Sequence, residues 1–383
     1  MKRFAFIIHP LTVADIARKF PWVRWFPESL VEGVFRWAPP VRTARCEGIR
    51  SGYSQVDGLF IACPLTTRQM LSLPEETVLA KVEKACRKAV DLGAQIIGLG
   101  AYTSIIGDGG VTLAKRLPVP VTTGNSYTVA TALEATRLAA ERLGYKLDRA
   151  AVVVVGATGS IGAVCSRLLA REASDLTLVA RRLDRLDRLA YRILHETGLS
   201  VGVTTDMAGA LRRADIVVAV SSAADAIIEP EHLKAGSLVC DVARPRDVSR
   251  RVAKERPDVL LIEGGVVKVP GDVNFGFNFG FPPGLAYACM AETMILALEG
   301  RRECFSLGRE LFIDKVEEIT RLGRKHGFSL AGLRSFDRPL SELDVERVRK
   351  SLFRPPRTAA GSQELDVDNI LQPGYNTKLK MVE

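Results

Sequence analysis

The sequence predicts an α/β protein built around a doubly wound parallel sheet. Three observations lead to this prediction: a length of 383 residues, a series of short apolar runs between residues 150 and 265, and a glycine-rich turn, GATGSIG, directly after the first of these runs. The length is enough for about two domains. Short apolar runs bounded by turn residues are typical of strands that are buried on both faces.

The N-terminal part of the chain alternates between strand and helix patterns. Helical spacing is predicted over 75–92 and 128–143, and strands are predicted over 1–10, 57–63 and 95–102. In the next part, five apolar runs form the predicted Rossmann-type sheet, at 150–155, 175–182, 215–223, 237–245 and 259–265.

This order of elements divides the chain into four parts. We expect an N-terminal α/β substrate domain over 1–130, an NADP-binding Rossmann domain over 131–272, an active-site segment with helices that return to the substrate domain over 273–334, and a flexible tail over 335–383.

Composition narrows the class of protein. Seven cysteines and four histidines are scattered singly, so no metal site is expected. The net charge of +9 favours an acidic partner, but no nucleic-acid motif accompanies it. The apolar run before His9 has five residues, too short for a signal peptide, so we expect a cytoplasmic protein. Glycines and prolines break the uncharged stretch 273–291, which leaves at most peripheral membrane contact.

The turn GATGSIG carries the residues that we expect to bind the cofactor. Its three glycines have the spacing G-x-x-G-x-x-G between a strand and a helix, which is the context that a dinucleotide-binding motif requires. The helix that follows would offer free N–H groups to phosphates. A tight turn without a ligand is the alternative. The predicted phosphate site consists of Gly156, Thr158, Gly159, Ser160, Ile161 and Gly162.

The next strand ends in Arg181 and Arg182, with no acidic residue to bind a ribose 2′-hydroxyl. Two guanidinium groups can hold a 2′-phosphate, so we expect NADPH as the cofactor. Two solvated surface arginines are the alternative. Asp241 ends a later strand on the cofactor side, where it would meet the ribose or nicotinamide, or else cap a turn.

Cys289 is the candidate nucleophile, although its surroundings do not show activation. We expect a helix that starts at Pro282–Pro283, which places Cys289 in its second turn, where the helix dipole has faded. Glu292, one turn along, would oppose a thiolate. The residues alone therefore favour an inert core thiol.

Several segments, in the same order, resemble the long-chain acyl-acyl-carrier-protein reductases that make fatty aldehydes and are best known from cyanobacteria. The resemblance runs from residue 1 to about 330 and is carried by FAFIIHPLT, RWAPP, GLGAYTSI, TTGNSYT, VGATGSIG, EGGVV, AYACMAE, LEGRRECFSLGR and KHGF.

The resemblance implies a reductase with a covalent intermediate. The family's active cysteine lies in the segment that matches AYACMAE, which places it at Cys289. Its thiolate would take the acyl group from an acyl-carrier protein or acyl-CoA, and reduction with NADPH would release an aldehyde. An aldehyde-consuming enzyme is a further expected partner. The alternatives are a shikimate-dehydrogenase-like NADP oxidoreductase on a small polar substrate and a non-catalytic nucleotide-binding sensor.

Two polar loops follow predicted strands and are candidates for positioning the substrate. We choose Ser104 and Asn125 for this role, and turn formation is the alternative for both. Related reductases often have histidine where this chain has Tyr127. The aromatic segment 20–40 holds three tryptophans, and packing against the core is favoured there over an acyl channel or a membrane contact.

Overall fold

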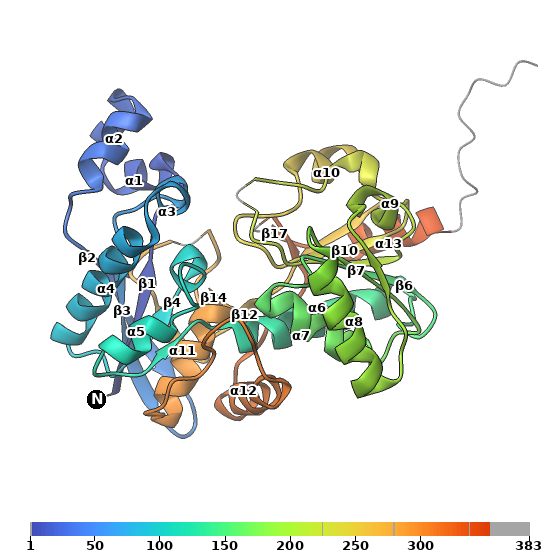
Figure 1. Ribbon diagram of the computed structural model, residues 1–383. Helices are drawn as coiled ribbons and strands as arrows, with labels where there is room; N and C mark the ends of the chain where they lie inside the picture. The colour runs from blue at the N-terminus through green and yellow to red at the C-terminus, as the bar shows by residue number, and fades with distance from the viewer. Residues whose placement is uncertain (1, 224, 279, 337, 353–383) are drawn as a thin grey trace, which may run out of the picture.

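The computed structural model describes residues 2–223, 225–278, 280–336 and 338–352. Two α/β halves lie side by side, and the long helix α6 (Asn125–Leu143) connects them (Figure 1). Each half has a six-stranded sheet. This confirms the predicted α/β class with a Rossmann-type sheet.

The N-terminal sheet has the strand order β13-β2-β3-β1-β4-β5, and β13 and β2 are its antiparallel edge. β1 shows why these residues form a central strand: Phe4 and Phe6 are buried on one face, Ala5 and Ile7 on the other. The strands are β1 (Lys2–Ile8), β2 (Val41–Arg50), β3 (Gln55–Ala62), β4 (Ile96–Leu99), β5 (Val121–Thr122) and β13 (Gly271–Asn274).

Helices cover both faces of this sheet. One face packs on α3 (Thr67–Ser72), α4 (Glu75–Asp91) and α5 (Val111–Arg116). The other face packs on α11 (Ala288–Glu299) and α12 (Ile313–His326), which return from the C-terminal part of the chain. Because β13 pairs with β2, the chain rejoins the N-terminal sheet at Gly271. The expected domain boundary at residue 272 therefore falls inside a strand.

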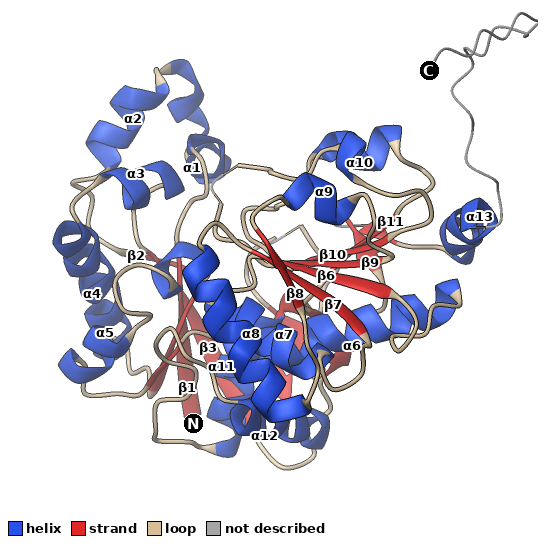
Figure 2. Ribbon diagram, turned by 45° about the vertical axis from the view of Figure 1, so that its right-hand side comes forward, coloured by secondary structure: helices blue, strands red, loops and turns tan. Residues whose placement is uncertain are grey.

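The second sheet is parallel throughout, in the order β11-β10-β9-β6-β7-β8. Val152 and Val154 pack with α6 and α7 (Ser160–Leu169), and Val153 and Val155 pack with the opposite layer, as a continuous apolar run allows. Figure 2 shows helices on both sides of this sheet. The strands are β6 (Ala151–Val155), β7 (Asp175–Val179), β8 (Gly202–Thr204), β9 (Ile216–Ala219), β10 (Leu238–Asp241) and β11 (Leu260–Glu263).

The helices of this half lie on both faces of the parallel sheet. They are α7 (Ser160–Leu169) and α8 (Leu183–Thr197) on one face, and α9 (Met207–Leu211) and α10 (Arg250–Glu255) on the other. The strand order reverses between β9 and β6, and ligands of such sheets bind outside the carboxyl ends of the strands at this point.

The expectation of a loose tail from Ser335 onward is wrong for its first part. Two short strands, β16 (Arg334–Ser335) and β17 (Arg338–Pro339), pair antiparallel, and α13 (Glu342–Leu352) follows. Val345 and Val348 are one helical turn apart and bury against the core around α6. The rest of the tail, 353–383, lies outside the described residues.

Two features are absent from the part of the chain that the structure describes. None of its helices combines the length and apolar character needed to span a membrane. Nor do three or more His, Cys, Asp or Glu side chains gather there as a metal ion would require.

Candidate active site

In the turn between β6 and α7, the packing of the fold requires glycine at two positions. Gly156 has φ +79°, and a Cβ there would lie 2.8 Å from Cα of Ser221. A Cβ on Gly162 would lie 2.3 Å from the carbonyl oxygen of Gly156. The first glycine therefore makes the tight turn, and the second lets α7 pack against it.

Gly159 is different, because nothing in the described fold requires it to lack a side chain. Its φ is −74°, and a Cβ there would come no nearer than 3.2 Å to another atom. It precedes α7, whose first N–H groups have no side-chain cap. A glycine at an uncapped helix start fits the close approach of a pyrophosphate.

The side chains around this turn complete the fit. Thr158 and Ser160 are at least partly exposed, and neither hydroxyl bonds to another part of the described chain. Ile161 packs its side chain on the core and presents its backbone N–H in the first turn of α7. The predicted residues thus form a site that suits the phosphates of NAD(P)H.

The two arginines after β7 differ in whether their guanidinium groups are held in ion pairs. Arg182 pairs with Asp184 through Nε at 3.0 Å and Nη2 at 2.8 Å, and Arg188 shares the same carboxylate. Arg181 is exposed, and the structure gives its side chain no ion pair within the described residues. Arg185, in the first turn of α8, likewise forms no ion pair there and was not predicted as a site residue. Its spacing of four from Arg181 was the available signal.

Asp241 caps a loop at the end of β10. Its carboxylate accepts the N–H groups of Ala243 and Val248, both at 3.1 Å, and its side chain is buried. Burial raises the pKa of Asp241 to about 7. Of the two roles expected for Asp241, the structure shows the turn cap, and the contact with ribose or nicotinamide stays a prediction.

The helix that carries Cys289 begins later than the sequence suggests. Residues 285–287 form β14 (Leu285–Tyr287), which pairs with β12 (Val266–Lys268), so α11 starts only at Ala288. Cys289 is therefore the second residue of α11, in its first turn, and the expected second-turn position is wrong. In the first turn the free N–H groups and the helix dipole act on the sulfur.

The Cys289 side chain is partly exposed, but its sulfur is in a desolvated setting. Burial raises the pKa of the thiol to about 12. The N–H of Met290 and the charge of Arg244 act in the opposite direction, and Glu292 reinforces the rise. The thiol is consequently protonated at neutral pH in this structure, and any activation must come with the ligands.

Two loops hold the backbone at Cys289. The N–H of Ala288 donates to the carbonyl of Gly265, just beyond β11, at 2.7 Å. From the other side Gly124 packs so closely that a Cβ there would lie 2.3 Å from Cα of Cys289. Cys289 thus lies between the carboxyl edge of the Rossmann sheet and the start of α6.

Of the two positioning residues, Asn125 is the one next to Gly124, which packs on the cysteine backbone. Asn125 opens α6 directly after Gly124 and is partly exposed. Ser104, in contrast, is buried in a 3-10 turn, η2 (Ala101–Ser104), where its hydroxyl donates to the carbonyl of Ala101 at 2.6 Å. This bond corresponds to the turn-forming alternative for Ser104.

Three residues that were not chosen as site residues from the sequence shape this region. Glu292 is fully buried and accepts the Thr122 hydroxyl at 2.5 Å and the Tyr127 N–H at 2.8 Å. It thereby fixes the start of α6 against α11. The Tyr102 hydroxyl donates to the carbonyl of Ser222 at 3.2 Å, a direct link between the two halves.

Arg244 is the third of these residues. Its guanidinium lies over the ring of Tyr287, 5.3 Å from the centroid, and 3.6 Å from Glu263. Tyr287 is the N-cap of α11, so a cation from the loop after β10 stands close to the start of the cysteine's helix. Only the folded chain brings 244 and 287 together, which is why no local pattern revealed it.

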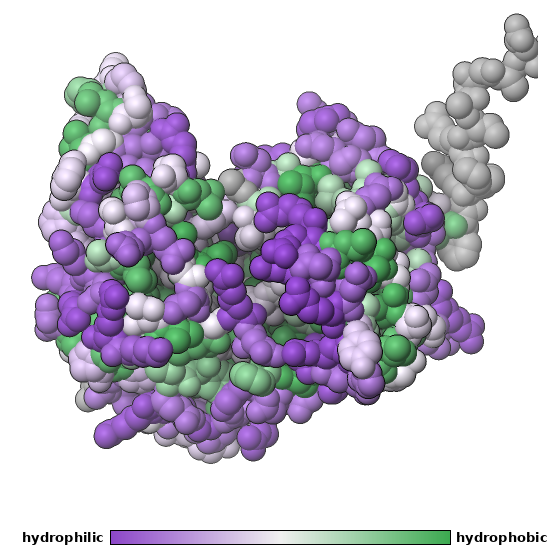
Figure 3. All heavy atoms as spheres, in the orientation of Figure 1, coloured by the Kyte–Doolittle hydropathy of each residue, from purple (hydrophilic) through white to green (hydrophobic). Residues whose placement is uncertain are grey.

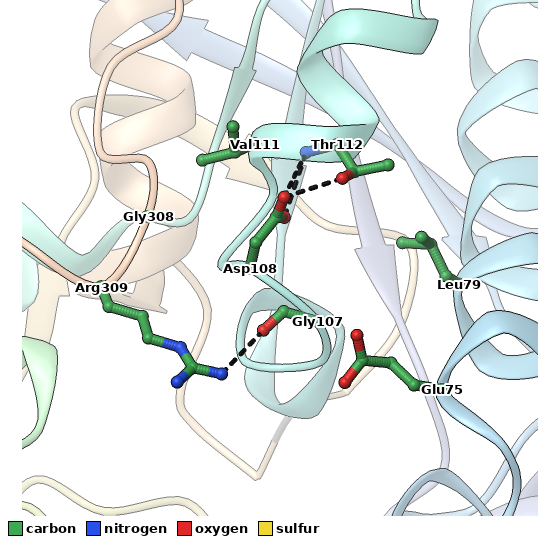
Figure 4. Close-up of a pocket in the computed structure, with 8 residues that line it drawn as sticks. All are labelled: Glu75, Leu79, Gly107, Asp108, Val111, Thr112, Gly308 and Arg309. Carbon is green, nitrogen blue, oxygen red and sulfur yellow. Dashed lines mark hydrogen bonds between the residues drawn. The ribbon is translucent and has the colours of Figure 1, made fainter.

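A separate pocket of about 460 Å³ lies in the N-terminal half (Figure 4). Its polar groups are engaged locally: Asp108 accepts the N–H and hydroxyl of Thr112, and Arg309 donates to the carbonyl of Gly107. Cys289 does not line it. The pocket is formed by Glu75, Leu79, Gly107, Asp108, Val111, Thr112, Gly308 and Arg309.

The chain is similar to several known proteins, over its Rossmann half or over most of its length. Residues 137–262, which include the Rossmann half up to β11, match the sequence pattern of the shikimate / quinate 5-dehydrogenase family. Aminotransferase PigE of a Serratia species is 36% identical over 367 residues, which cover 90% of this chain but only 41% of that protein. Glutamyl-tRNA reductase of Mannheimia succiniciproducens is 28% identical over 219 residues, 55% of this chain and 48% of that protein.

The long-chain acyl-[acyl-carrier-protein] reductase of Synechococcus elongatus is 31% identical over 340 residues. The alignment covers 84% of this chain and 97% of that protein, so it includes both sheets and the segment between them. With a Rossmann half suited to NAD(P)H, the chain belongs to the family of NAD(P)-dependent oxidoreductases that includes this Synechococcus reductase.

Proposed function

We propose that the protein reduces a long-chain acyl thioester to a fatty aldehyde with NADPH, through an acyl group held on Cys289. The position of Cys289 carries the proposal. It lies in the first turn of α11, held against Gly265 at the carboxyl edge of the Rossmann sheet, where a nicotinamide would lie. At this edge an acyl group on the thiol would lie next to the nicotinamide, whereas a thiol inside the core could not reach it.

The first step is acyl transfer to the protein. The Cys289 sulfur attacks the thioester carbonyl, the carrier thiol leaves with the proton, and a new thioester forms on Cys289. The N–H groups of the first turn of α11 and the amide of Asn125 are the donors best placed to stabilise the developing oxyanion. When bound, NADPH would supply the hydride that converts this thioester to an aldehyde, and the cysteine, which leaves as a thiolate, takes a proton from water.

The carrier of the acyl group is an acyl-carrier protein or coenzyme A. Both are acidic, and the chain has a net charge of +9, which favours association with either through long-range attraction. An aldehyde-consuming enzyme is a reasonable further partner, because a long-chain aldehyde is poorly soluble in water.

The alternative, a dehydrogenase that acts on a small substrate, is supported by the sequence match to the shikimate / quinate 5-dehydrogenase family. That match ends at residue 262 and contains neither Gly124 nor Cys289. It therefore supports the nucleotide site alone and leaves the acyl-transfer chemistry to the remaining residues.

A direct test is to incubate the full chain with palmitoyl-carrier protein in the absence of NADPH and to measure its intact mass. We expect one palmitoyl adduct, absent from Cys289→Ser and retained in Cys304→Ser, which removes an exposed thiol. Addition of NADPH should remove the adduct and release hexadecanal. An unacylated wild-type protein that still reduces a small ketone would overturn the proposal and favour the dehydrogenase alternative.

A further inference from the structure

All three tryptophans of the chain lie on one protrusion of the N-terminal half, and all three are exposed. The exposed fractions are 55% for Trp22, 87% for Trp25 and 77% for Trp37. The protrusion consists of α1 (Val13–Lys19), the 3-10 turn η1 (Pro21–Trp25) and α2 (Glu28–Phe35) with the turn that follows it. Phe26, Leu30 and Val34 are also exposed: Phe26 packs edge-on against Trp22 at 6.0 Å between ring centroids, and Leu30 and Val34 share one side of α2. We call these six side chains the tryptophan face.

This exposure is a fixed feature of the protrusion and does not come from poor packing. The segment has its own small core of Val13, Ile16, Ala17, Val23 and Val31, with Phe20 and Phe35 packed against it at 5.6 Å between ring centroids. Glu32 anchors α2 to the body of the domain by accepting the Thr66 hydroxyl at 2.7 Å. The favoured expectation for segment 20–40, packing of its aromatic residues on the core, is therefore wrong for the tryptophans.

The charges around the tryptophan face are mostly cationic. Arg24 and Arg42 are exposed, and Arg36 and Lys81 lie 5.6 and 5.9 Å from the centroid of the Trp37 ring. Of the nearby carboxylates, Asp15 accepts the Leu11 N–H at 3.0 Å and Glu32 is buried, so Glu28 at the start of α2 is the exposed acidic residue beside four cations. A ligand of this face would meet aromatic rings flanked by guanidinium and ammonium groups.

The protrusion also has a defined place relative to the active site. It connects the carboxyl end of β1 to β2, whose first residue, Val41, lies opposite Ala62 at the carboxyl end of β3. The loop that carries Gly124 follows β5 at the same edge of the sheet. Figure 1 shows α1 and α2 beyond this edge, and Figure 3 shows hydrophobic side chains gathered at the tip of the protrusion.

We propose that the tryptophan face docks on an anionic lipid bilayer. Tryptophan is enriched at membrane interfaces, because its ring is apolar and its N–H is polar. Arginine and lysine beside it would meet the anionic headgroups, and the apolar side chains would enter the boundary with the acyl chains. The face is mainly apolar with cations at its side, which suits a bilayer better than the acidic surface of a carrier protein. This inference does not depend on Cys289.

The tryptophan content makes the test selective, since the tryptophan fluorescence of the whole chain reports only this protrusion. We would titrate the full-length protein with vesicles of phosphatidylcholine and phosphatidylglycerol in a ratio of 3:1, and with phosphatidylcholine alone. We expect a blue shift of the tryptophan emission and co-sedimentation with the anionic vesicles, both weakened by salt. Trp25→Ser/Trp37→Ser should bind at least about tenfold more weakly.

The matched control is Phe312→Ser/Leu343→Ser, which removes two exposed apolar side chains outside the protrusion. It should bind like the wild type. Failure of the wild type to bind either vesicle would overturn the proposal. So would loss of binding in the control alone. A tryptophan-dependent dimer, or an emission shift caused by carrier protein without vesicles and without lipid binding, would assign the face to a protein partner instead.

Discussion

Gly124 packs directly on the backbone of Cys289, and a Cβ at residue 124 would stand 2.3 Å from Cα and 2.5 Å from Cβ of the cysteine. The two residues are far apart in the sequence, yet the start of α6 and the start of α11 share this contact. The starts of α6 and α11 therefore meet at the backbone of Cys289, and each helix contributes a partial positive charge there. The N–H groups of Ser126 and Tyr127 in the first turn of α6 are already engaged, with the Ser306 hydroxyl and the Glu292 carboxyl group. The position of the proposed nucleophile therefore depends directly on how closely Gly124 packs against it.

Gly124→Ala should separate these two helix starts. The added methyl would overlap the cysteine backbone, and φ of +76° adds strain for any residue with a Cβ. We expect acylation of Cys289 to slow by about 100-fold with NADPH binding retained, because the shift moves the sulfur relative to the acyl group. Mass spectrometry over a time course measures this.

Gly198→Ala is the matched control, since Gly198 has φ +78° but open space around it. It carries the same conformational strain without the overlap, and its acylation rate should equal that of the wild type. Equal rates for the alanine variants at 124 and 198 would mean that the close packing is irrelevant to the reaction.

Glu292 should act as a neutral carboxylic acid that holds the start of α6. Burial raises its pKa, and it accepts the N–H of Tyr127 and the hydroxyl of Thr122. Glu292→Gln keeps an acceptor oxygen and should cost less than about 1 kcal/mol of unfolding free energy. Glu292→Ala leaves a buried N–H unpaired beside a cavity and should cost roughly 2–4 kcal/mol.

Urea unfolding at several pH values tests this assignment. A carboxyl group whose pKa is raised by folding stabilises the protein below its unfolded pKa and loses that contribution as pH rises through the folded pKa. Glu292→Gln lacks this loss. Its stability relative to the wild type should therefore improve from pH 5 to pH 8, and an unchanged difference over that interval would show that Glu292 is already ionised in the folded protein.

Arg181 should select NADPH more strongly than Arg182. The Arg182 guanidinium is held by Asp184 through two bonds, whereas Arg181 has no such partner among the described residues. A charged hydrogen bond to a 2′-phosphate is worth about 1.5–3 kcal/mol, so Arg181→Ala should weaken NADPH binding about ten- to a hundredfold and leave NADH binding unchanged. Fluorescence titration of each nucleotide gives the ratio, and an equal effect of Arg182→Ala would contradict the assignment.

The reactivity of Cys289 should increase steadily with pH in the absence of ligands. Burial raises its pKa to about 12, so the thiolate fraction grows about tenfold for each pH unit below that value. In a Cys304→Ser background, alkylation by iodoacetamide should rise from pH 7 to pH 10 without a plateau. Cys289→Ser/Cys304→Ser gives the background from the buried thiols. A plateau below pH 8 would instead indicate a thiolate that is already formed at neutral pH.

The sequence predicted the parallel sheet and its glycine turn well, because both depend on local signals. The run Ala151–Val155 has the apolar continuity of a strand buried on both faces, and a glycine triplet between strand and helix is typical of a nucleotide-binding turn. The position of Cys289 depended on a long-range pair instead. Val266–Lys268 draws Leu285–Tyr287 into a strand, and this pairing moved the helix start past the two prolines. Propensity at 282 and 283 contains no information about a partner so distant in the sequence.

The remaining site residues and packed elements depend on contacts that no local pattern of the sequence shows. Ser104 and Asp241 follow strands as functional side chains often do, but their oxygens bond to the backbone nearby. Val345 and Val348 are apolar side chains in a mostly polar helix, too few to indicate a packed element until the surface of α6 is present. Arg244 and Glu292 act through contacts across the fold, and their neighbours in sequence give no sign of them.

Gly159 and Gly162 should separate cofactor binding from folding, although they belong to one motif. A Cβ on Gly162 would lie 2.3 Å from the carbonyl oxygen of Gly156, so Gly162→Ala should lower the unfolding free energy by about 1–3 kcal/mol. A Cβ on Gly159 would lie 3.2 Å from the same oxygen, which a small shift relieves, so Gly159→Ala should fold with a change below about 1 kcal/mol. Its methyl would occupy the space in which a pyrophosphate approaches α7, and NADPH binding should weaken at least about tenfold. Urea unfolding and NADPH titration of both variants distinguish the two roles. If Gly159→Ala binds NADPH like the wild type, the phosphates do not lie on this turn, and the glycine spacing serves the fold alone.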